Sequence, residues 1–275
     1  MVEATKAGTM STAGFDFGRN WDDYSLARID DERLRLAVDS INNLLGCDTI
    51  RGLTFLDVGC GSGLFSIAAT MCGAARVIGV DVNQKCVDVS IRNWSQLSEK
   101  AENVTMPDFK VGSALDSTFM RDLGVFDVVY AWGSLHHTGD MWSAISNAAG
   151  CVKRPGGTLV MAIYNAHWSC AGWTLIKKVY NLSPRFIKSL FNLVFGGVIY
   201  AAKFLVTGRN PLQKERGMDF WYDVIDWLGG YPYEYASSKE IVERMQHMGF
   251  SLRTCVPPSA PTGCNEFVFD VAETD

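Results

Sequence analysis

The sequence predicts an α/β fold, a doubly wound and mostly parallel seven-stranded sheet with a helical insertion before its last helix and strands. Short apolar runs alternate with helix-compatible segments from residue 54 to 165, and such alternation requires parallel pairing through right-handed crossovers. A final helix pattern and two strand patterns close the chain. With 275 residues and 48% hydrophobic composition, the chain can bury a core without disulfides or metals.

Five strands are predicted in the alternating part, because each segment is short, apolar and bounded by glycine or polar residues. They cover residues 54–60, 75–82, 104–111, 126–133 and 157–165. Pro107 cannot donate to a sheet ladder, so 104–111 is expected to be an edge or broken strand.

Helices are predicted over 30–45, 64–72, 84–97, 140–151 and 237–248. The last begins with Ser237 and Glu240 at capping-box spacing. The segments FSLRTCV (250–256) and EFVFDVA (266–272) then form a closing pair of strands.

The segment 166–236 has a different pattern, aromatic and helical. Its apolar run from Phe186 to Val206 is uninterrupted by charge for only 14 residues, between Lys188 and Lys203. Because a membrane span needs about 20 apolar residues, a buried or interfacial helix is predicted in preference to a transmembrane one.

Net charge is −5, which argues against a dedicated nucleic-acid binder. The segment from 177 to 216, however, contains eight basic residues and a single acid, Glu215, which gives it a local charge of +7. This segment is expected to contact a membrane surface or a lipid-like, anionic acceptor, unless it is simply a solvated face. No apolar leader and no metal-ligand spacing are visible, so a cytoplasmic chain with no metal is expected.

A glycine turn follows the first strand, with Gly59, Gly61 and Gly63 at GxGxG spacing. Dinucleotide sites use GxGxxG, and an acid before the turn, here Asp57, would repel a pyrophosphate but can pair with an ammonium group. A second acid, Asp81, ends the next strand. A carboxylate there can accept hydrogen bonds from both hydroxyls of a ribose. A ligand with a ribose and an amino-acid end therefore fits better than a dinucleotide.

These residues carry a family resemblance. LDVGCGSG resembles motif I of the class I S-adenosylmethionine-dependent methyltransferases, which are Rossmann-like, and GVDVN resembles their ribose-binding loop. VGSALD, FDVVYAWGSLHHTGDMWSAI and KRPGGTLVMAIYN resemble the segments at strands three, four and five. DWLGGYPYE and GCNEFVF resemble C-terminal elements of bacterial small-molecule members, and FDFGRNWDDYS an element that folds over the cofactor.

The resemblance implies S-adenosylmethionine as the cofactor, with S-adenosylhomocysteine as the product. It divides the chain into a tail and cofactor-covering helices (1–49), a binding core (50–165), a cap (166–236) and a C-terminal part completing the core (237–275). Either Ser113 or Ala114 would meet the adenine. The implied cofactor residues are Trp21, Asp57, Gly59, Cys60, Gly61, Gly63, Asp81, Val82, Ser113, Ala114, Trp132 and Gly133.

Candidate catalytic residues are His136, His137, Tyr164 and Asp223. An oxygen acceptor needs a base, whereas a thiol ionises near neutral pH without one. The two histidines follow strand four, at the edge where open α/β sheets bind ligands, and only one of two neighbours can face an acceptor. The alternative is that the pair positions the loop.

Aromatic residues beside acids in the cap suit an acceptor pocket, although they also suit a packed structural turn. The candidate substrate-binding residues are Asn165, Trp221, Tyr222, Tyr231, Tyr233 and Asn265.

The leading hypothesis is methyl transfer to the oxygen or thiol sulfur of a small molecule by in-line displacement. RNA or protein methylation is the alternative within enzymes, although AWGS stands where amino-directed nucleic-acid enzymes have an NPPY-like sequence. A non-catalytic S-adenosylmethionine-binding regulatory module is the alternative outside them. The sequence leaves the acceptor and the oligomeric state open.

Overall fold

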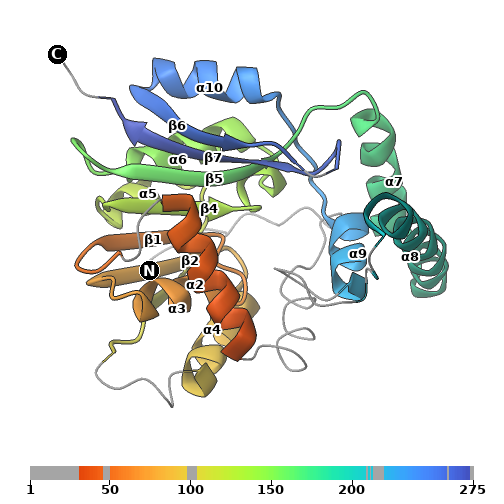
Figure 1. Ribbon diagram of the computed structural model, residues 1–275, viewed down its shortest axis with the longest axis horizontal. Coiled ribbons are helices and arrows are strands. Elements are labelled where there is room, and N and C mark those ends of the chain that lie inside the picture. Colours follow the sequence, from red (N-terminus) through yellow and green to blue (C-terminus); the bar gives the residue numbers. More distant parts are fainter. Residues whose placement is uncertain are drawn as a thin grey trace, which may run out of the picture.

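The computed structural model describes residues 31–45, 50–97, 104–208, 210, 212, 220–258 and 260–272 (Figure 1). Within them one seven-stranded sheet has the order β3-β2-β1-β4-β5-β7-β6. The strands are β1 Thr54–Val58, β2 Arg76–Asp81, β3 Asp108–Val111, β4 Val128–Trp132, β5 Thr158–Tyr164, β6 Phe250–Val256 and β7 Cys264–Val271.

The first five strands pair in parallel, and β7 lies antiparallel between β5 and β6. The predicted doubly wound, mostly parallel sheet is confirmed. Strand order reverses between β1 and β4, and the carboxyl ends of these neighbouring strands form the edge where such sheets bind ligands.

Helices cover both faces of the sheet (Figure 1). On one face lie α2 Asp31–Leu45, α3 Leu64–Met71 and α4 Gln84–Leu97. On the other lie α5 Ser117–Asp122, α6 Met141–Gly150 and α10 Ser238–His247. Successive side chains along a strand point to opposite faces of the sheet. Phe55 therefore packs with α2 and α3, while Leu56 packs in the core with α6 and α10.

The insertion forms three helices beyond one end of the sheet, α7 Cys170–Leu182, α8 Arg185–Thr207 and α9 Phe220–Gly229 (Figure 1). They have a small apolar cluster of their own, centred on Tyr180, Phe220, Val224 and Leu228. The sequence predicted a buried or interfacial helix for the apolar run. The prediction that this helix is buried is wrong, because only 6% of Arg185–Ala202 is buried. By length and composition alone, the same stretch could cross a bilayer.

The local differences from the predictions are small and have local causes. β3 begins only at Asp108, after Pro107, and is an outer strand, as Pro107 indicated. Two short helices were not predicted, α5 and the 3₁₀ helix η2 Leu135–His137, since neither is long enough for a periodic pattern. The Ser237 cap of α10 is confirmed, since its hydroxyl accepts a hydrogen bond from the Glu240 amide.

Candidate functional site

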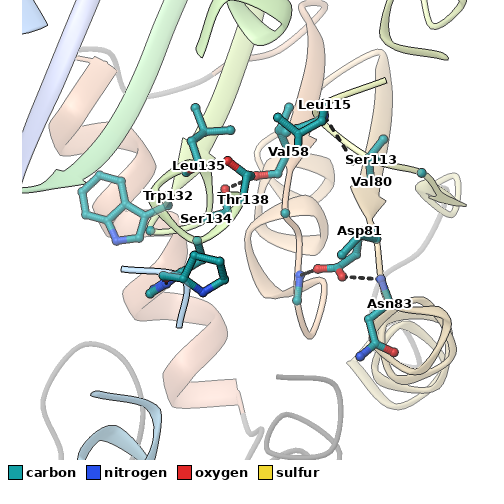
Figure 2. Close-up of a pocket in the computed structure, with 18 of the residues that line it drawn as sticks. Val58, Val80, Asp81, Asn83, Ser113, Leu115, Trp132, Ser134, Leu135 and Thr138 are labelled. Carbon is teal, nitrogen blue, oxygen red and sulfur yellow. Dashed lines mark hydrogen bonds between the residues drawn. The ribbon is translucent and has the colours of Figure 1, made fainter. Parts of the chain in front are cut away.

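A cleft of about 470 Å³ opens at the carboxyl ends of β1, β2 and β4 (Figure 2). Strand ends and loops of the core form one part of it, and α9 with the loop after it forms another. Its lining residues are Val58, Gly59, Gly61, Val80, Asp81, Val82, Asn83, Gly112, Ser113, Ala114, Leu115, Trp132, Gly133, Ser134, Leu135, His137, Thr138, Asp226, Tyr231 and Pro232.

The glycine turn makes the floor of the cleft. The amides of Gly59 and Cys60 donate to the Val80 carbonyl at 2.7 and 3.0 Å, which ties the turn to β2. Gly59 has a φ of +77°, and a Cβ there would lie 2.2 Å from the Cβ of Ser134. Only glycine fits this close crossing of two backbone segments.

Asp81 is fixed by two backbone donors at the end of β2. The Gly61 amide donates to one of its carboxylate oxygens at 3.0 Å and the Asn83 amide to the other at 2.9 Å. Burial raises its pKa, and the two hydrogen bonds oppose that rise. Figure 2 shows Asp81 and Asn83 on the side of the cleft opposite Trp132. A carboxylate with lone pairs left over beside a glycine turn fits the vicinal hydroxyls of a ribose.

The loop after β3 supplies the next part of the lining. Ser113 and Ala114 both reach the cleft, and the Ala114 carbonyl accepts a hydrogen bond from Asn147 of α6 at 2.8 Å. Val82 and Leu115, both more than a third exposed, flank them with apolar surface. An apolar slot with fixed backbone groups suits a flat heterocycle such as adenine.

Three predicted cofactor residues lie outside this lining. Asp57 is 3% exposed and accepts a hydrogen bond from the Ser66 hydroxyl at 2.7 Å, because its strand neighbour Val58 takes the cleft side. Burial raises the pKa of Asp57 to about 7. Cys60 and Gly63 pack against Ser90 of α4 instead. Trp21 lies outside the described residues.

His137, in η2 after β4, contacts the part of the cleft wall that the insertion forms. Its Nδ1 lies 2.6 Å from the Pro232 carbonyl oxygen, which can only accept, so Nδ1 carries the proton and Nε2 the lone pair. Burial lowers its pKa to about 3, so the ring is neutral at physiological pH. Gly230 packs against the ring, where a Cβ would lie 2.8 Å from Cε1.

His136 faces away from the cleft, as expected for the neighbour of a lining residue. It is 1% exposed, and its ring lies on Tyr164 with centroids 3.9 Å apart. Burial holds the pKa of His136 well below its usual value. Neither His136 nor Tyr164 lines the cleft, so both support the His137 wall from behind.

A buried lysine lies behind the same wall. Lys177 is fully buried, donates to the Trp227 carbonyl, and sits over the rings of Trp227 and Tyr233 at 4.2 and 4.8 Å. Burial lowers its pKa to about 7, opposed by the charge of Asp226. The aromatic faces also favour the ammonium form, so they act against the effect of burial on the pKa of Lys177.

Of the predicted substrate residues whose side chains the structure describes, only Tyr231 lines the cleft. Tyr233 is buried beside Lys177, and Trp221 packs on Gly196 of α8. Asn265 donates to the Asn165 side chain at 3.0 Å, so these two polar groups satisfy one another. The side chains of Tyr222 and Asp223 lie outside the described part of the structure.

Sequence reasoning missed Lys177 as a part of this site. Among the acids of the cap, Asp223 was the predicted catalytic residue, whereas Asp226, three residues later on α9, is the one that the structure describes at the cleft. Lys177 had no local signal, because only the tertiary fold surrounds it with aromatic rings. The described residues contain no group of three or more His, Cys, Asp or Glu side chains that could hold a metal.

Comparison with known proteins agrees with this geometry. A family model described as a methyltransferase domain matches residues 27–254, most of the chain. The chain is 31% identical over 139 residues to a ubiquinone biosynthesis O-methyltransferase of Coxiella burnetii, covering 50% of this chain and 55% of that protein. It is 32% identical over 145 residues to the 27-O-demethylrifamycin SV methyltransferase of Amycolatopsis mediterranei, covering 51% and 48%.

The chain thus spans about half the length of these curated relatives. Among solved structures, the magnesium protoporphyrin IX methyltransferase of Synechocystis PCC 6803 with bound SAH is similar, with a TM-score of 0.56 and 17% identity. That match covers 94% of this chain and 95% of that one, and it shows a shared fold.

Proposed function

The chain belongs to the methyltransferase domain family, and we propose that it transfers a methyl group from S-adenosylmethionine to a hydroxyl oxygen of a small organic molecule. Oxygen is proposed as the acceptor atom because of the position and protonation of His137. Its Nδ1 is committed to the Pro232 carbonyl, so its basic Nε2 belongs to the cleft wall.

The core side of the cleft fits the cofactor. Asp81 would hold the ribose hydroxyls, Ser113 and Ala114 would border the adenine, and the Gly59 turn gives room for the amino-acid end. When bound, S-adenosylmethionine supplies a methyl group on a sulfonium, which makes that carbon electrophilic. Trp132 and Gly133 extend the same wall and would limit the cofactor's position.

The insertion side would handle the acceptor. The acceptor hydroxyl would donate to His137 Nε2, which takes the proton as the oxygen loses it. Asp226 lines the same cleft, and its negative charge would favour the imidazolium that results. The pKa of about 3 keeps the His137 ring neutral, so Nε2 would accept a hydrogen bond from the acceptor hydroxyl at physiological pH. Because so low a pKa makes the ring a weak base, full proton transfer would require the pKa to rise in the complex with the acceptor.

Relatives support the acceptor class. Both curated relatives reported above are named for O-methylation or for an O-demethyl substrate. Apolar and aromatic groups such as Leu135, Trp132 and Tyr231 around a few polar ones suit a phenol or enol carried on an apolar body.

The test uses labelled S-adenosylmethionine and paired acceptors that differ only in the reacting atom, such as a catechol or quinol and its thiol analogue. His137→Asn keeps a donor for the Pro232 carbonyl but removes the distal ring nitrogen. We expect kcat for the hydroxyl acceptor to fall about 100-fold or more, with the cofactor Kd unchanged.

His247→Asn is the matched control, because His247 also bonds a backbone carbonyl through Nδ1, 2.6 Å from the oxygen of Glu243, but on exposed α10. It should leave turnover unchanged. Transfer to thiols that is insensitive to His137→Asn would contradict oxygen transfer and favour sulfur. Tight cofactor binding without transfer to any acceptor would favour a regulatory module, and transfer to RNA or protein would favour macromolecular methylation.

A further inference from the structure

The outer face of α8 is apolar and exposed. Phe186, Leu190, Leu193, Val194 and Val198 recur every three or four residues and are between 51% and 72% exposed. The inner face is apolar too, and Phe191, Phe195 and Ile199 belong to the cluster shared with α7 and α9. The helix is therefore apolar on both sides, and nothing in the described residues covers the outer one.

Helix α7 continues the feature. Leu175, Val179 and Leu182 follow helical spacing and are 63%, 44% and 76% exposed. Trp168, just before this helix, is 88% exposed. Exposed apolar patches of this extent mark interaction surfaces, and an exposed tryptophan beside them is typical of a bilayer interface.

The charge of this region identifies the partner. The sequence from 166 to 214 contains no aspartate or glutamate, although the whole chain has net charge −5. Lys178 and Arg185 are exposed, whereas Lys188 lies toward the inner face of α8, with its ammonium over the ring of the buried Tyr180. Apolar side chains edged by lysine and arginine, with no acids, complement a bilayer that contains anionic lipid.

Two other occupants fit less well. A second copy of the chain would bring these basic residues together across a two-fold axis, with no acid in the segment to pair with them. If α8 crossed a membrane, α7 and α9 would have to enter the membrane with it, because Trp173 of α7 and Phe220 of α9 pack on aromatic rings of α8. Those helices hold the buried Lys177 and the cleft acid Asp226.

We propose that the outer face of α7 and α8 docks on the surface of an anionic phospholipid bilayer, with both helices lying in the interface. This docking surface is defined by the exposed apolar side chains of α7 and α8 named above, by Trp168, and by the basic residues Lys178 and Arg185. The docking stands independently of the proposed reaction. In combination with that reaction, it brings the acceptor wall close to the bilayer, since α9 packs on both docked helices and Asp226 lines the cleft (Figure 1).

The test is sedimentation of the full chain with vesicles of phosphatidylcholine containing about a third phosphatidylglycerol. We expect binding that weakens as salt rises and is at least tenfold weaker with pure phosphatidylcholine. Leu190→Glu with Val194→Glu should weaken binding at least tenfold, and Lys178→Gln with Arg185→Gln should weaken it only on anionic vesicles.

Leu53→Glu with Val125→Glu is the matched control, because both residues are exposed apolar side chains elsewhere, 37% and 58% exposed. It should bind like the unchanged chain. Thermal melts and cofactor titrations of each variant show that folding is intact without relying on turnover.

Three results would overturn the proposal. The first is no sedimentation with anionic vesicles. The second is a stable dimer in solution that Leu190→Glu with Val194→Glu dissociates, which would assign the surface to a second copy. The third is vesicle association that resists both high salt and alkaline washing, which would assign α8 to a membrane span.

Discussion

Asp57 and Asp81 end neighbouring strands on either side of one glycine turn, yet they meet different surroundings. Asp81 faces the cleft and holds two backbone amides, whereas Asp57 is enclosed with Ser66. The sequence indicated a ligand role for both, because strand and spacing look alike. Only the alternation of side chains along β1 separates them, and a one-residue difference in register is invisible in a motif.

Asp57→Asn tests that separation. Asn keeps an acceptor for the Ser66 hydroxyl, so we expect the Kd for S-adenosylmethionine to change less than threefold. Because the folded pKa of Asp57 is about 7, the folded state holds a proton that the unfolded state has lost, and the wild type loses stability as pH rises from about 4 to 7.

The Asn variant lacks this loss. Urea titrations should therefore show its stability relative to wild type improving across that pH range, by up to about 4 kcal/mol. A relative stability that does not vary with pH, or a large loss of cofactor affinity, would contradict this account of Asp57.

For Lys177, the stability of the folded state changes with pH in the direction opposite to that for Asp57. Its folded pKa is about 7, below the usual 10.5, so the unfolded state binds more protons between these values and stability rises with pH there. Relative to Lys177→Met, the wild type should gain up to about 1.4 kcal/mol per pH unit above pH 7. Urea titrations at pH 6, 7.5 and 9 measure this, and a constant difference would show that Lys177 does not titrate with a lowered pKa.

Among the elements of the site, the glycine turn is tightly constrained at Gly59. Gly59→Ala adds a Cβ that would lie 2.2 Å from the Cβ of Ser134, so we expect cofactor binding to be lost in a titration. Gly124→Ala is the matched control, because Gly124 also has a positive φ, +89°, but has open space around it. It should cost about 1 kcal/mol of stability and leave binding intact.

A second substitution distinguishes the steric clash with Ser134 from the backbone strain of an alanine at positive φ. Ser134→Gly removes the Cβ and hydroxyl that the new methyl group would meet. Combined with Gly59→Ala, it should restore part of the cofactor affinity. Equal loss in the single and double variants would show that the φ requirement, and not the crossing with Ser134, limits this turn.

Elements with long or well-bounded patterns were predictable from sequence. The five parallel strands, α4 over Gln84–Leu97 and the Ser237-capped α10 follow from periodicity, caps and glycines. The short α5 and the 3₁₀ helix were not, because a cap such as Asp116 acts locally and leaves no periodic trace. For α8 the sequence left a buried and an interfacial helix open, since an apolar run does not reveal which of its faces has a partner.

At the scale of the whole molecule, the site joins segments that are distant in sequence. Gly59, Asp81, His137 and Asp226 meet because the carboxyl ends of β1, β2 and β4 share one edge and α9 returns to it. The core half was predictable, since its motif is contiguous and tied to strand ends. The acceptor half was not, because Asn165 and Asn265 bond each other and Trp221 packs on α8.

The most direct measurement of the central claim is calorimetric titration with S-adenosylmethionine of the wild type, Asp81→Ala and Asp88→Asn. Asp88 is an exposed acid on α4 that bonds Gln84, so it controls for loss of one negative charge. We expect one site per chain, a Kd raised about 10- to 100-fold by Asp81→Ala, and no change with Asp88→Asn. Equal affinity in all three proteins, or no binding to the wild type, would contradict it.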